Sequence, residues 1–91
     1  MDLQANAQLA GGPEWEPEGR AQARFREILR RAGHEEILLH ALETFGSVHK
    51  AVHWLDRRNH IFEGETAALK IETDPLAVEA ELTRIDHGVF I

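Results

Sequence analysis

Six histidines are the residues of this chain that most readily suggest chemistry, because a neutral imidazole is the commonest metal ligand in proteins. His49 and His53 lie four residues apart in a predicted helix and therefore share a face. A thermolysin-like zinc site would place Glu directly after the first histidine and add a third ligand. Here Lys50 follows His49, and a cation beside a metal ion is unfavourable. His60, in a predicted loop, is the nearest third candidate, so we expect neither a metal site nor a cofactor.

Nucleophilic or acid–base catalysis has little support in the sequence. The chain contains no cysteine and no tyrosine, and its single serine, Ser47, is better explained as a helix cap. No glycine-rich phosphate loop is present. Glu79 and Glu81 fall on different faces of a predicted helix, so they do not form a catalytic pair. We therefore expect a protein that is not an enzyme.

The elements that would position these side chains are predicted to be helices. Apolar residues recur at intervals of three and four over residues 18–33, 35–45, 48–57 and from 75 almost to the end of the chain, with a shorter helical turn around 67–71. Starts and stops are marked by Pro17, Gly33, Gly46, Ser47 and the pair Asp74-Pro75. No segment alternates with a period of two for long enough to be a strand. We predict an all-α fold, a small compact bundle of four to five helices with a flexible N-terminal tail over residues 1–17.

The same periodicity predicts which side chains form the core. In the third helix Trp54 is expected beside the buried face rather than in it. The apolar faces of the longer helices contain Phe25, Ile28, Leu29, Ala32, Ile37, Leu38, Ala41, Leu42, Phe45, Val48, Ala51, Val52, Leu55, Val78, Leu82, Ile85 and Val89. The short helical turn holds Ala67, Ala68, Leu69 and Ile71.

Length and composition indicate one small domain of 91 residues without disulfides. Neither a signal peptide nor a membrane-spanning segment is evident, so we expect a cytoplasmic protein. The formal charge of −6 is uneven, because residues 1–33 sum to zero and residues 34–91 carry the whole excess. An acidic half repels nucleic acid and attracts a basic protein cleft.

Two features leave alternatives open. The helices on either side of Gly46 superficially suggest a helix-turn-helix, in which Lys50, His53 and Arg57 would contact DNA. The apolar end of the chain, Val89-Phe90-Ile91, either packs into the core or binds another protein.

A resemblance bears on the second feature. The matching residues are Phe45-Gly46-Ser47, Lys50-Ala51, Trp54-Leu55, Asn59, Gly64, Thr66, Leu69, Thr73-Asp74 and Arg84-Ile85-Asp86-His87-Gly88-Val89. On these residues the range 34–91 resembles the toxin-binding domain of the Xre/MbcA/ParS antitoxins of bacterial type II toxin–antitoxin systems.

The resemblance implies an antitoxin that binds a RES-domain toxin, an enzyme that consumes NAD or transfers ADP-ribose from it. Relatives inhibit by covering or entering the active-site cleft with the C-terminal part of this domain. The implied toxin-binding residues are Arg84, His87, Gly88, Val89, Phe90 and Ile91. We also expect a homodimer or a hetero-oligomer with the toxin, because five helical stripes and an apolar end exceed what so short a chain can bury.

The chain departs from the family pattern in two ways. Arg58 and Ala67 stand where many relatives carry proline. Relatives also place a helix-turn-helix domain of some 55–60 residues upstream, whereas only 33 residues precede His34. We therefore divide the chain into a tail (1–17), an N-terminal helix without a complete helix-turn-helix domain (18–33) and the toxin-binding domain (34–91). The alternatives are a DNA-binding transcriptional regulator, or a helical interaction module with an unrelated partner.

Overall fold

The structure, a computed structural model, describes residues 17–88 of the chain. Helices make up most of this range. The elements are α2 (Pro17–Ala32), α3 (Glu35–Phe45), α4 (Val48–Leu55), the 3₁₀ turn η1 (His60–Phe62), α5 (Ala67–Thr73) and α6 (Pro75–Asp86). No strand occurs over this range, where Arg58 and Thr66 form an isolated bridge. Over residues 17–88, the predicted all-α class and number of helices are confirmed. The tail predicted over residues 1–17 lies outside the described residues except for Pro17, which already belongs to α2.

Local signals set most of the helix ends. Gly33 and Gly46 adopt the left-handed conformation, with φ of +70° and +85°, which glycine reaches without a Cβ penalty. The Ser47 hydroxyl accepts a hydrogen bond from the Lys50 amide at 3.2 Å. The Asp74 carboxylate caps α6, and Pro75 occupies its first turn. These boundaries are the ones the sequence predicts.

One predicted boundary is wrong, because α4 ends at Leu55 and not at Arg57. Two sets of contacts hold the chain just beyond the end of the helix. Asp56 is bound by Arg24 of α2 through two hydrogen bonds of 2.8 and 2.9 Å. The Asn59 amide then donates to the Glu65 carbonyl at 3.1 Å, which closes the loop between α4 and α5 on itself.

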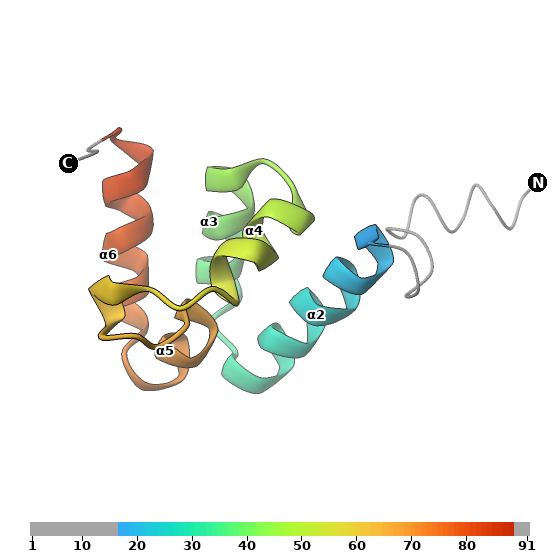
Figure 1. Cartoon of the computed structure of the whole chain (residues 1–91), viewed down its shortest axis with the longest axis horizontal. Coiled ribbons are helices and arrows are strands. Elements are labelled where there is room, and N and C mark those ends of the chain that lie inside the picture. Colours follow the sequence, from blue (N-terminus) through green and yellow to red (C-terminus); the bar gives the residue numbers. More distant parts are fainter. Residues whose placement is uncertain (1–16, 89–91) are drawn as a thin grey trace, which may run out of the picture.

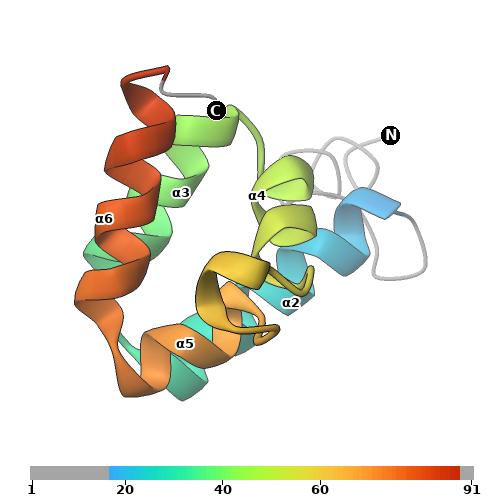
Figure 2. The same ribbon diagram turned by 60° about the vertical axis from the view of Figure 1, so that its left-hand side comes forward.

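The helices pack around one core that includes side chains from all five. α3 packs against both α4 and α6, α2 packs against α4 and α5, and α5 packs against α6. Figures 1 and 2 show α6 and α2 at opposite ends of the molecule, with α3 and α4 between them. The largest of the fully buried side chains are Leu38, Leu55, Ile71, Val78 and Leu82.

One residue is placed differently from the predicted pattern. Trp54 is in the core and not beside it, with 7% of its surface exposed. Its ring centroid lies 5.4 Å from that of Phe45 and 6.3 Å from that of Phe62, which comes from η1. Leu69 is 52% exposed, because Ala67, Ala68 and Ile71 already fill the inward face of the short helix α5. Val89 lies outside the described residues.

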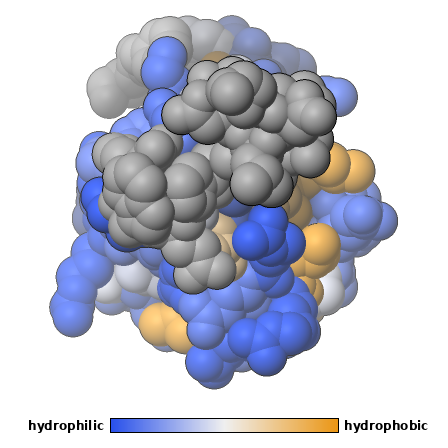
Figure 3. All heavy atoms as spheres, turned by 90° about the vertical axis from the view of Figure 1, so that its right-hand side faces the viewer, coloured by the Kyte–Doolittle hydropathy of each residue, from blue (hydrophilic) through white to orange (hydrophobic). Residues whose placement is uncertain are grey.

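The face of the molecule at the α2 end shows mainly hydrophilic residues. Where described atoms are visible, hydrophobic residues form separate small areas and not one broad patch (Figure 3). The described residues visible on this face therefore offer no single large apolar surface to a partner.

Candidate functional site

The C-terminal end of α6 is attached to α3 by a cluster of polar side chains that we call the His40 cluster (His40, Thr44, Glu79 and Asp86). His40 Nδ1 lies 2.8 Å from Glu79 Oε2, and His40 Nε2 lies 2.5 Å from Asp86 Oδ2. The Thr44 hydroxyl donates to Asp86 Oδ1 at 2.6 Å. One imidazole from α3 thus joins two carboxylates of α6, Glu79 near the middle of the helix and Asp86 at its C-terminal end.

The environment of His40 favours its charged form. Burial of the ring lowers the pKa of His40, but the hydrogen bonds to Asp86 and Glu79 outweigh that effect and raise the pKa above its ordinary value. The hydrogen bonds from Thr44 and His40 lower the pKa of Asp86. A protonated imidazole donates from both ring nitrogens, whereas a neutral imidazole donates to only one carboxylate. The full cluster therefore requires His40 to be protonated and Asp86 to be ionised.

A dependence of stability on pH follows from these directions. The contribution of His40 is complete below its ordinary pKa of about 6.5 and is lost as the pH rises through its raised folded-state pKa. The contribution of Asp86 is complete above about pH 3.9 and is lost as the pH falls through its lowered folded-state pKa. We expect the cluster to stabilise the fold most between about pH 4 and 6.5. Urea denaturation should show that His40→Ala lowers the free energy of unfolding by about 1–2 kcal/mol at pH 6 and by less at pH 9. An equal loss at both pH values would contradict this assignment.

The His40 cluster was not predicted from the sequence. Asp86 belongs to the string of residues that resembles the antitoxin family, and His40 and Thr44 share a face of α3 at a spacing of four. The hydrogen bond between His40 and Asp86 joins residues 46 positions apart. Neither the resemblance nor the spacing on α3 identifies this contact without the fold.

The predicted toxin-binding residues that the structure describes lie close together, at and just after the C-terminal end of α6. Arg84 is in the last turn, where its Nε donates to Glu81 Oε1 at 3.0 Å. His87 follows the helix and is exposed, and its amide donates to the Thr83 carbonyl at 3.1 Å. Gly88 is exposed with a φ of +69°, so the chain turns away from the helix axis there.

The other three predicted toxin-binding residues, Val89, Phe90 and Ile91, lie outside the described residues. Arg84 also has a structural role, because Glu81 is buried and removing its partner would leave a carboxylate uncompensated. His87 is therefore a cleaner mutagenesis target than Arg84.

A second cluster lies on α4 and contains the three residues considered for DNA binding. Lys50, His53 and Arg57 line a hollow of about 460 Å³. We call it the aromatic hollow, because Phe45 and Trp54 contribute its apolar wall, and His49 completes its lining.

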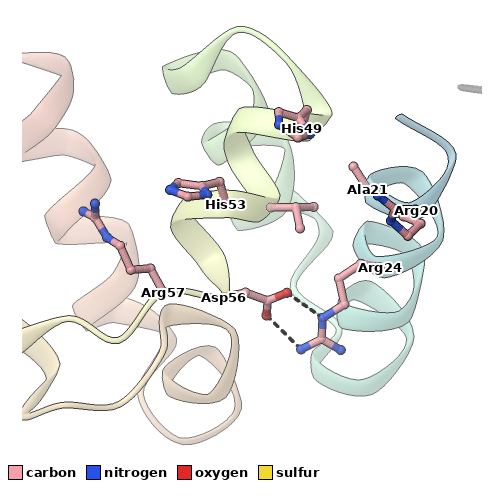
Figure 4. Close-up of a pocket in the computed structure, with 8 residues that line it drawn as sticks. Arg20, Ala21, Arg24, His49, His53, Asp56 and Arg57 are labelled. Atoms are coloured by element: carbon pink, nitrogen blue, oxygen red, sulfur yellow. Dashed lines mark hydrogen bonds and ion pairs between the residues drawn. The ribbon is translucent and has the colours of Figure 1, made fainter. Parts of the chain in front are cut away.

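A neighbouring groove of about 460 Å³ lies between α2 and α4 and shares His49, His53 and Arg57 with the aromatic hollow. Figure 4 shows the Arg24–Asp56 hydrogen bonds at one end of this interhelix groove, while the side chains of His53 and Arg57 point away from α2. These two residues therefore form a ridge between the two depressions.

The charge of the α4 face is positive. Within residues 17–88, Lys50 and Arg57 make no ion pair. The nearest acidic lining residue of the groove, Asp56, is neutralised by Arg24. An anionic group that enters the aromatic hollow would meet cations already exposed to it and would displace no existing partner.

In the described residues, His49 and His53, the pair that suggested metal binding, have no third ligand arranged beside them. Over the described part of the chain, no group of three or more His, Asp or Glu side chains is arranged to hold a metal ion. Over the same part, no helix has the length and apolar character needed to cross a lipid bilayer.

Comparison with known proteins adds no further assignment. No protein-family model matches the chain, and no curated protein or solved structure matches it.

Proposed function

We propose that this chain is the antitoxin of a type II toxin–antitoxin system. In this proposal it binds a RES-domain toxin in the cytoplasm and blocks the toxin's active site with residues 84–91. The observation that carries the proposal is that the His40 cluster attaches the end of α6 to α3. Asp86, which belongs to this cluster, precedes the apolar residues Val89-Phe90-Ile91 by three positions.

A rigid base for the inhibitory segment favours tight binding. A segment that is already oriented loses less conformational freedom when it enters a cleft. Thr44 and His40 hold Asp86 by hydrogen bonds of 2.6 and 2.5 Å, so the start of the segment has a defined position. Gly88 then directs the chain away from the helix.

The distribution of charge supports the same surface. Residues 59–88 contain two Lys or Arg residues and seven Asp or Glu residues, and they include η1, α5 and α6. Basic groups near the cleft of an enzyme favour binding of the phosphates of NAD. The acidic half of this chain is complementary to such a cleft, and it contains the helix that leads to the proposed inhibitory segment.

Co-expression with the product of the neighbouring open reading frame tests the proposal. We expect that product alone to stop bacterial growth and to deplete cellular NAD, and we expect this chain to restore both. A harmless neighbour that does not co-purify with this chain would overturn the proposal. If the two proteins do co-purify, light scattering on the purified complex distinguishes a homodimer from a hetero-oligomer with the toxin.

Regulation of transcription by DNA binding is the second candidate, and the exposed cations Lys50 and Arg57 favour it. It requires salt-sensitive binding to promoter DNA that is lost in Lys50→Ala, because each phosphate contact releases counterions. Fluorescence anisotropy with a promoter fragment at low salt tests it, and no binding under those conditions would eliminate it.

A further inference from the structure

We propose that the aromatic hollow and the interhelix groove together form a docking site for a short acidic segment of a partner protein. The segment places apolar side chains in the two depressions and carboxylates beside the cations around them. None of the described residues 84–88 lines either depression, so this surface is separate from the end of α6. The inference therefore does not depend on the proposed function.

The two depressions are parts of one surface. Each has a volume of about 460 Å³, and His49, His53 and Arg57 line both of them. Figure 4 shows the two histidines on α4 and Arg57 just after it, with α2 across the groove. Each volume falls in the range of roughly 300–1,000 Å³ that is typical of ligand sites, so each depression can receive a large side chain.

The charge of this surface is positive. The described lining residues include the cations Arg20, Arg24, Lys50 and Arg57 and one carboxylate, that of Asp56. Arg24 neutralises Asp56 through hydrogen bonds of 2.8 and 2.9 Å. Lys50 and Arg57 are exposed, and neither has an ion-pair partner between residues 17 and 88. On a chain with a net charge of −6, this local excess of cations favours an acidic partner.

The walls between these cations are apolar. Phe45 and Trp54 contribute to the wall of the aromatic hollow, and Ala21 and Val52 contribute to that of the interhelix groove. Apolar side chains of a partner would lose contact with water here, while carboxylates on either side would meet the cations. Recognition of acidic motifs by clusters of basic residues is a recurring mode of peptide binding.

The length of α4 sets the spacing of the acidic residues in the partner. Lys50 lies in the first turn of α4 and Arg57 follows its end, so most of a helix about 12 Å long separates them. An extended peptide covers that length with about four residues. The complementary segment therefore carries two acidic residues about three positions apart, with apolar residues between them.

Nucleic acid fits this surface less well than an acidic peptide does. A DNA duplex carries one negative charge per roughly 1.7 Å of its length, so it would also meet the acidic residues of the rest of the chain. Trp54 is only 7% exposed and offers little ring surface on which a base could stack. A short segment places its charges only where the cations are.

Nuclear magnetic resonance of the isotopically labelled full chain tests the proposal without any toxin. The probe is the acetylated and amidated peptide Asp-Glu-Phe-Leu-Glu-Asp. We expect it to shift the amide resonances of Lys50, Trp54 and Arg57, with a dissociation constant of about 1 mM or tighter. We expect Asp-Glu-Ala-Ala-Glu-Asp and Lys-Lys-Phe-Leu-Lys-Lys to bind at least about fivefold more weakly. Absence of these shifts, or equal binding of the three peptides, would overturn the proposal.

A charge-reversal pair separates a specific contact from a general electrostatic effect. Lys50→Glu removes a cation from the aromatic hollow, and the new carboxylate is favourable in the first turn of α4, so the fold should persist. We expect this variant to weaken peptide binding at least about fivefold. The matched control Lys70→Glu makes the same change of net charge on α5 and should alter binding by less than about twofold in 0.1 M salt. Equal effects of the two variants would contradict the proposed contact.

Two other occupants are distinguished by the same resonances. If a duplex oligonucleotide shifts these amides at a lower concentration than the acidic peptide does, the surface binds nucleic acid and the proposal is wrong. If the amides of Lys50 and Trp54 shift when the unliganded chain is diluted, a second copy occupies the surface and the proposal is again wrong. Peptide binding by a chain that neutralises no toxin would support this inference and overturn the proposed function.

Discussion

Deletion of Val89-Phe90-Ile91 is expected to abolish toxin neutralisation and to leave the helical fold intact. Full burial of a large apolar side chain contributes roughly 1.5–3 kcal/mol, and about 1.4 kcal/mol corresponds to a tenfold change in the dissociation constant. After losses for imperfect fit, three such side chains should account for at least about 100-fold in affinity. The fold should persist because buried side chains between Ile28 and Leu82 already supply a core to which all five helices contribute.

The affinity is measured by isothermal titration calorimetry with a catalytically inactive toxin, and the fold by far-ultraviolet circular dichroism. Leu76→Ala is a suitable control, because it removes an exposed apolar side chain from the opposite end of α6. If the shortened chain remains folded and inhibits as well as the full chain, the C-terminal segment is not the inhibitory element. If the deletion unfolds the protein, these residues belong to the core.

Leu82→Ala is expected to lower the free energy of unfolding by about 3–4 kcal/mol, in the range measured for buried leucines in other proteins. The Leu82 side chain is 0% exposed and belongs to the core to which all five helices contribute. The substitution removes apolar contacts and leaves a cavity that the packed helices cannot fill. Because small domains have a total stability of only roughly 5–15 kcal/mol, this variant should be partly unfolded at physiological temperature.

The matched control for this prediction is again on α6. Leu76→Ala makes the same chemical change in the same helix, but the Leu76 side chain is 78% exposed. We expect its effect to stay within about 0.5 kcal/mol. Urea denaturation at low protein concentration, followed at 222 nm, measures both variants. Similar losses for the two variants would mean that α6 is not packed on the core as described.

The helical class and most helix ends were predictable because their causes are local. A glycine at a positive φ, as at Gly46, and a cap such as Ser47 act within about four residues along the chain. The i, i+3, i+4 spacing also identified Ile28, Leu38 and Val78 as core residues, and they are buried. These features would be similar in any fold that kept the same helices.

Part of the candidate site was predictable in the same sense. Arg84, His87 and Gly88 are close in sequence, so their proximity at the end of α6 follows from the helix itself. Lys50, His53 and Arg57 lie within or just after α4 at spacings of three and four, which places them on one side of it. The sequence could not reveal the aromatic hollow between them and Phe45, because a hollow depends on how α3 and α4 pack.

The sequence by itself determined the helices, their caps and the acidic character of residues 34–91. Only the tertiary structure decided that Trp54 is buried and Leu69 is not, since a short helix can place only one of its faces against its neighbours. It also decided that His40 meets Asp86, 46 residues away, and that α4 ends where Arg24 binds Asp56. Such contacts depend on which helix faces meet, and periodicity within a single helix does not contain that information.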